Sequence, residues 1–147
     1  NHVPAKWKDK APKVVRTAAG VDEWEYNGIS SSTPFGMAAT VGWPQEEWGF
    51  NPVSYAEMRP GCFDAAERVR DMNANGVLGS MCFPSFRGFA RRLFATVDDK
   101  DLALAVTRAY NDWHVDEWCG AHPGRFIPMG LPILWDPELA AEEVRRL

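Results

Sequence analysis

Apolar residues recur at helical spacing in three stretches of the second half of the chain. The first stretch begins after Asp64, a suitable N-cap, and ends at Asn75-Gly76, where Gly76 suits a left-handed C′ position. This spacing predicts a helix, and its apolar face consists of Ala65, Ala66, Val69 and Met72.

The second stretch predicts a long helix from about Asp99 to Cys119. Asp98 and Asp101 favour its start through capping and through the helix dipole. Its predicted apolar stripe consists of Leu102, Ala105, Val106, Ala109 and Trp113. A third helix opens at Asp136-Pro137, the preferred N-cap and N1 residues, and stays helical in character to Leu147.

Two short apolar runs separate these helices. Residues 77–83 lack strict alternation, as expected for a strand buried on both faces, whereas Pro128 and Pro132 weaken the strand prediction for residues 125–134. The order helix, strand, helix, strand, helix is typical of a parallel α/β sheet. Because two strands do not close a barrel, we expect the chain to be part of a larger unit.

Residues 1–60 have a different character and are rich in Gly, Pro, Ser and Trp. We expect a short helical turn over 4–9, and a small hairpin that pairs 13–17 with 23–26. No sustained period follows from 28 to 60, and such irregular segments often lie over an active site. Four of the seven tryptophans fall in this part, and they are Trp7, Trp24, Trp43 and Trp48. These rings either pin an irregular segment onto the body or, for at least one of them, face a ligand.

Composition narrows the class of protein. The net charge of −4, from 16 basic and 20 acidic residues, disfavours nucleic acid as the main partner. No apolar run is long enough to span a membrane, and no signal peptide pattern is visible. Cys62, Cys82 and Cys119 are far apart and form no disulfide framework, so we expect a reduced, cytoplasmic setting with Cys82 in the core.

The residue types of a metal site do not gather in the sequence. His2, His114 and His122 belong to no His-x-His or HExxH pattern, and each is expected to be structural. The acidic pairs Glu46-Glu47 and Glu142-Glu143 are expected on solvated faces. No nucleophile elbow and no glycine-rich phosphate loop is present. We therefore predict no catalytic residue and no metal ligand within the chain.

Position along the strands gives the remaining candidates. In parallel α/β architectures, ligands bind at the carboxyl ends of strands, and the first strand ends just before Ser85, Phe86 and Arg87. Ser85 and Arg87 suit a carboxylate, and Phe86 suits stacking on a flat substrate. Trp48, from the irregular segment, offers a further apolar contact. Asp136 follows the second strand but is already explained by helix capping.

Several segments, taken in order, resemble the amidohydrolase-related proteins that are relatives of aminocarboxymuconate-semialdehyde decarboxylase. The match spans nearly the whole chain, and the order of the motifs is more specific than any one of them. The segments are PAKWKDKAP (4–12), RPGCFD (59–64), RVRDMNANGV (68–77), FPS (83–85), AYNDW (109–113), GRFIP (124–128) and DPELA (136–140).

The resemblance implies a (β/α)₈ TIM-type barrel of at least twice this length. Residues 1–147 would be its N-terminal part, with 1–60 as an irregular, cap-like segment and 61–147 as regular α/β units. The family usually holds a divalent metal, often zinc, and its ligands are expected outside this chain. A small-molecule substrate, the remainder of the barrel and a homo-oligomer are the implied partners, with no nucleic acid and no membrane.

The resemblance leaves the reaction open between a hydrolase and a carbon–carbon lyase such as a decarboxylase. An alternative from another class stays open as well. In it, the chain is a non-catalytic binding module that uses its Trp-rich first third as a contact surface.

Overall fold

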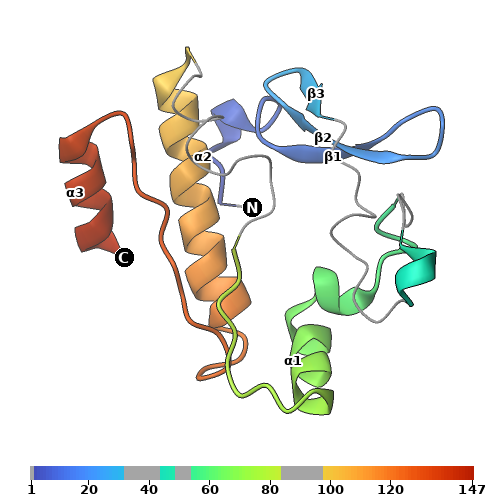
Figure 1. The fold of residues 1–147 in the computed structure, drawn as a ribbon. Coiled ribbons are helices and arrows are strands. Elements are labelled where there is room, and N and C mark those ends of the chain that lie inside the picture. Colours follow the sequence, from blue (N-terminus) through green and yellow to red (C-terminus); the bar gives the residue numbers. More distant parts are fainter. Residues whose placement is uncertain (1, 32–43, 49–53, 84–97) are drawn as a thin grey trace.

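The computed structural model describes residues 2–31, 44–48, 54–83 and 98–147 of the chain. The helices and strands are β1 (Lys13–Arg16), β2 (Asp22–Tyr26), β3 (Ile29–Ser31), α1 (Ala65–Ala74), α2 (Lys100–Asp112), the π-helix η5 (Trp113–Cys119) and α3 (Pro137–Arg146), with short 3-10 turns at η1 (Ala5–Trp7), η3 (Gln45–Glu47) and η4 (Pro60–Cys62). A small antiparallel sheet lies beside the first half of the longest helix, α2. Helix α3 lies on the other side of α2, and helix α1 lies below the sheet in the view of Figure 1.

The predicted hairpin is confirmed and extended. β1 pairs antiparallel with β2, Val14 lying opposite Trp24, and β2 pairs in turn with β3. The third strand was not predicted. It follows Asn27 and Gly28, whose φ values of 51° and 75° are those of a two-residue hairpin turn that matches the twist of its strands.

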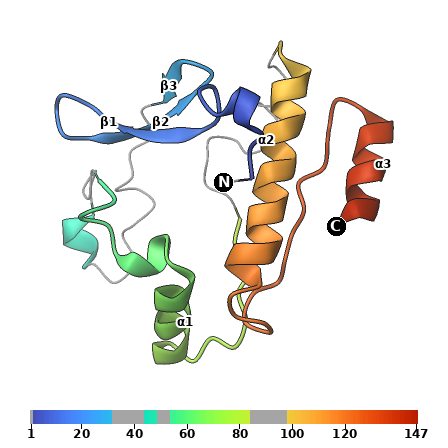
Figure 2. The same ribbon diagram turned by 180° about the vertical axis from the view of Figure 1, so that it is seen from behind.

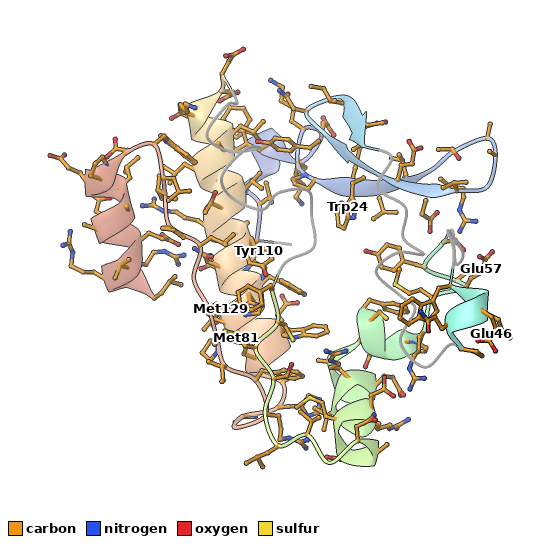
Figure 3. All side chains as sticks on the ribbon, in the orientation of Figure 1. Trp24, Glu46, Glu57, Met81, Tyr110 and Met129 are labelled. Carbon is orange, nitrogen blue, oxygen red and sulfur yellow. The ribbon has the colours of Figure 1, made fainter. Side chains whose placement is uncertain are left out.

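Two contacts tie this sheet to the segment that precedes α1. The buried carboxylate of Asp22 pairs with Arg16 at 2.6 Å and accepts a hydrogen bond from the backbone N–H of Tyr55 at 2.9 Å. Trp24 projects from β2 and packs in one cluster with Met58 (Figure 3). Described parts of the irregular first third are therefore packed together.

Helix α1 forms where the sequence predicts, but of the predicted apolar face only Met72 is fully buried and Ala66 is exposed. The Asp64 carboxylate accepts from the Glu67 N–H at 2.9 Å, and Gly76 has a φ of 67° just past the helix end. The turn before the helix is held by an ion pair between Arg59 and Asp71. Gly61 lies so close to Asp71 that a Cβ there would meet the carboxylate, which accounts for a glycine in this turn.

Helix α2 carries the first hydrophobic cluster. Leu102, Ala103 and Val106 pack against Tyr26 of β2, so the small sheet is docked on the first half of the helix. Both views of the ribbon show this arrangement (Figures 1 and 2). The predicted stripe is shifted: Leu102, Val106 and Ala109 are buried as predicted, but Ala105 and Trp113 are only partly buried, and the polar Thr107 and Asn111 are buried.

The start of α2 differs from the sequence prediction by one residue. Asp99, and neither Asp98 nor Asp101, is the N-cap, and its carboxylate accepts from the Leu102 N–H at 3.0 Å. We expect Asp99→Ala to lower the free energy of unfolding of the full-length protein by about 1 kcal/mol, measured by urea denaturation. The exposed neighbour provides the control: Asp98→Ala should change it by less than about 0.5 kcal/mol. Equal losses for the two variants would contradict this assignment.

The helix changes character at Trp113. From there to Cys119 the backbone is a π-helix, and the Gly120 N–H donates to the Val115 oxygen five residues earlier at 3.0 Å. This wider turn places Trp118 and Cys119 in a second cluster with Met72 of α1 and Phe126. Cys82 packs against that cluster but is only partly buried, so the prediction of a buried core cysteine is confirmed only in part.

Helix α3 begins as predicted, with the Asp136 carboxylate accepting from the N–H groups of Glu138 and Leu139 at 2.9 and 3.0 Å. The prediction of a solvated Glu142-Glu143 pair is wrong for Glu143, whose side chain is 1% exposed. Glu143 faces α2, where Arg108 donates to it at 3.1 Å and Asn111 at 2.7 Å. Burial is tolerated because every carboxylate oxygen has a charged or amide donor.

Candidate functional site

Two extended segments between the helices lie parallel to each other. Ser80 and Phe126 form a parallel bridge, in which the Ser80 N–H donates to the Arg125 oxygen and the Ile127 N–H donates to the Ser80 oxygen, both at 3.0 Å. The parallel direction agrees with the predicted α/β order. The predicted strand lengths are wrong for the described residues. Segments 77–83 and 125–134 pair there through an isolated bridge and form no continuous strands.

The two faces of this parallel pair differ in what covers them. Phe126 faces the helices, and its ring contacts the Trp118 ring in a tilted arrangement with the ring centres 5.5 Å apart; Cys82 packs on the same cluster. Alternate residues point to the opposite side, where Met81, Phe83 and Ile127 are 44%, 74% and 53% exposed. One face is therefore covered by helices, and the other is an open apolar face.

Arg125 holds the amino end of the first segment. Its guanidinium donates to the backbone oxygens of Leu78 and Val77 at 2.9 and 3.1 Å. This contact accounts for an arginine in the motif 124–128. Because both segments run in the same direction, their carboxyl ends point to the same side of the bridge, the side on which parallel α/β proteins bind ligands.

Of the four predicted substrate contacts, only Trp48 lies within the described residues. Ser85, Phe86 and Arg87 lie outside the described residues. Trp48 follows the turn η3 and is 57% exposed. Glu46 beside it is exposed as predicted, and Figure 3 shows its position near η3, apart from Met81 and Met129. The structure does not bring Trp48 to the strand ends through any described contact, so all four residues stay predictions.

Two of the three histidines have partners at the surface. His2 Nε2 lies 2.7 Å from a carboxylate oxygen of Glu117, which joins the start of the chain to η5. The ring of His122 meets the ring of Phe126 edge-on at 6.4 Å. Both contacts suit structural residues, and the structural role of each histidine stays a prediction.

His114 is the buried histidine. Its ring stacks on Tyr110 at 5.7 Å with an interplanar angle of 10°, and its Nε2 lies 3.6 Å from the Cys119 sulfur. Burial lowers the pKa of His114 and raises the pKa of Cys119. Both shifts favour the neutral forms and disfavour the thiolate–imidazolium arrangement of cysteine hydrolases.

A divalent metal does not fit the residues that the structure describes. All three histidines lie in the described ranges, yet no group of three or more His, Cys, Asp or Glu side chains there converges on one point. Structural and catalytic zinc sites both need at least three such ligands. The described residues therefore form no three-ligand metal centre.

A family model described as Amidohydrolase matches residues 2–147. The chain belongs to the amidohydrolase family. Amidohydrolase domains have the TIM-barrel fold, and the α/β order with its parallel pair agrees with that fold. The superfamily generally uses divalent metals.

Two further findings complete the comparison. No curated protein matches the amidohydrolase chain in sequence. Within the described ranges, no helix combines the length and the apolar character that a membrane span requires.

Proposed function

We propose that this chain is the N-terminal part of a metal-dependent hydrolase or decarboxylase related to aminocarboxymuconate-semialdehyde decarboxylase. The substrate is a small carboxylated or cyclic organic molecule. Membership of the amidohydrolase family supports the class of enzyme. The ordered motifs, from residues 4–12 to residues 136–140, support the subfamily.

The open face of the two parallel segments is the observation that carries this proposal. Met81, Phe83 and Ile127 are large apolar side chains that a finished domain would bury. In a closed barrel, side chains from the other strands fill this space. The metal, zinc in this proposal, is then held by ligands from those other strands, in agreement with the lack of a ligand group among the described residues.

This chain would contribute to substrate binding at the carboxyl edge. Arg87 and Ser85 follow the first strand and would hold a substrate carboxylate through charge-assisted hydrogen bonds. Phe86 would stack on a cyclic substrate, and Trp48 would add apolar contact from the segment at the barrel mouth. The chain's own residues thus bind and orient the substrate.

The alternative, a non-catalytic module with a Trp-rich contact surface, has less support. Trp7 packs against the cluster of Tyr26 and α2, and Trp24 packs with Met58. Trp48 is the strongly exposed tryptophan among the described residues. A single exposed indole is not a contiguous apolar patch of the size that marks interfaces.

The test uses the full-length protein. We expect about one divalent ion per chain by elemental analysis, and loss of turnover of carboxylated cyclic substrates after chelation, restored by Zn²⁺. Arg87→Ala should raise KM at least about 10-fold, because it removes a charge-assisted hydrogen bond to the substrate. Arg70→Ala is the matched control, since Arg70 is an exposed arginine paired with Glu67 on α1. Absence of any divalent ion from the freshly purified protein would contradict the proposal.

A further inference from the structure

The side chain of Asn111 on α2 binds the second parallel segment as a neighbouring strand would. It is fully buried, at 0% exposure. Its Oδ1 accepts from the Leu131 N–H at 2.7 Å, and its Nδ2 donates to the Leu131 oxygen at 3.1 Å. One residue of the segment thus has both backbone polar groups satisfied by one amide.

The local sequence explains why such a partner is needed. Pro128 and Pro132 flank Leu131 and have no N–H to donate to a neighbouring strand. The described bridge to the first segment is at Phe126, five residues before Leu131. The amide of Asn111 therefore replaces the strand pairing that the prolines weaken.

Glu143 fixes which way this amide points. Its carboxylate accepts from Asn111 Nδ2 at 2.7 Å and is itself held by Arg146 at 2.6 and 2.8 Å. Because a carboxylate can only accept here, the NH₂ group must face it, which leaves Oδ1 for the Leu131 N–H. An aspartate at this position would lack the donor and would repel Glu143, so the site requires an amide.

We infer that Asn111 is a positioning residue that sets where the carboxyl end of the 126–134 segment lies. Leu131 is three residues before Leu134, so a shift at Leu131 moves the edge where ligands bind. The effect on turnover rests on the proposed function, whereas the effect on the segment does not. Small displacements of binding groups are costly because catalysis depends on a near-attack geometry.

The test compares Asn111→Ala with Asp112→Asn in the full-length protein. The control removes the ion pair of Asp112 with Arg146, at 2.5 Å, and leaves Leu131 untouched. We expect native-state amide exchange of 129–135 to accelerate at least about 10-fold in Asn111→Ala, and less than about 2-fold in the control. No local acceleration in Asn111→Ala, or equal acceleration throughout the protein, would overturn the inference.

A second pair of variants tests the chemistry of the contact. Asn111→Asp should accelerate the same exchange, and Glu143→Gln added to it should restore part of the protection, because an amide then faces a carboxylate again.

In the active enzyme, Asn111→Ala should lower kcat at least about 10-fold with a smaller change in KM. An unchanged kcat would remove the positioning role. If the protein has neither metal nor activity, the proposed function fails, while the exchange result still decides whether Asn111 holds the segment.

Discussion

Replacing Glu143 by Ala is expected to lower the free energy of unfolding by about 3–5 kcal/mol, a large share of the stability of a typical domain. The variant removes the closer of the two acceptors of the buried Asn111 amide and leaves Arg108 and Arg146 without their shared carboxylate. Removing one member of a buried ionic network costs more than the network contributes, because the remaining groups lose their partners. Denaturation of the full-length protein in guanidinium chloride measures the loss.

Glu142→Ala is the matched control for this variant. Glu142 is the neighbouring acid, it is 57% exposed, and its contact with Arg108 is long at 3.6 Å. Exposed pairs of this kind contribute about 0–1 kcal/mol. Similar losses for Glu142→Ala and Glu143→Ala would show that the buried network contributes no more to the free energy of unfolding than an exposed ion pair does.

The lowered pKa of Glu143 also predicts how the free energy of unfolding depends on pH. The hydrogen bond from Arg146, followed by those from Asn111 and Arg108, lowers the pKa of Glu143 from 4.5 to about 2. Since the folded-state pKa is the lower one, the stabilisation is complete above pH 4.5 and is lost as the pH falls toward about 2. Glu143→Gln should flatten the stability profile in that window, and an unchanged profile would contradict the assignment.

Gly120→Ala is expected to lower the free energy of unfolding by about 3 kcal/mol. Gly120 has an ordinary helical φ of −66°, so the cost does not come from its own backbone conformation. A Cβ at this position would overlap the backbone oxygen of Asp116 and lie 2.9 Å from its carbonyl carbon. Backbone atoms of the π-helix η5 cannot move aside without breaking its hydrogen bonds.

Gly130→Ala separates this effect from a general intolerance of glycine substitution. The atom that its Cβ would meet is Cδ1 of Leu147, at the far end of a flexible side chain that can rotate away. We expect a loss below about 1 kcal/mol for Gly130→Ala, measured in the same denaturation experiment. A loss for Gly120→Ala no larger than this would show that η5 adapts to the added methyl group.

Local signals in the sequence were sufficient for most of the helical structure. Asp64 and Asp136 are N-caps because their carboxylates reach the N–H groups two or three residues ahead, which depends only on neighbouring residues. The hairpin of β1 and β2 was also readable. The strand β3 was missed, although Asn27-Gly28 is the turn signal that precedes it.

The features that could not be predicted depend on contacts between residues far apart in the sequence. Glu143 looks like a surface residue beside Glu142, and its burial depends on Asn111, 32 residues earlier. A polar residue on the apolar side of α2 was the available signal, since Asn111 and Thr107 lie among Leu102, Val106 and Ala109. The change to a π-helix at Trp113 has no sequence signature of this kind, although the π-helix places Trp118 and Cys119 against Met72 and Phe126.

The position of the proposed site stays a prediction from the sequence. Parallel order placed it at the carboxyl ends of 77–83 and 125–134, and the Ser80–Phe126 bridge confirms the parallel direction. Ser85, Phe86 and Arg87 stay predictions because they lie outside the described residues.

The contact between Asn111 and Glu143 sets an order for events on the ribosome. Helix α2 leaves the exit tunnel well before α3, so its buried amide and Arg108 lack the Glu143 carboxylate until residue 143 has been synthesised. Domains fold during synthesis from the N-terminus, at about 5–20 residues per second. A nascent chain that ends before Glu143 should therefore hold residues 126–134 loosely, and this part of the barrel should become protease-resistant only after α3 emerges.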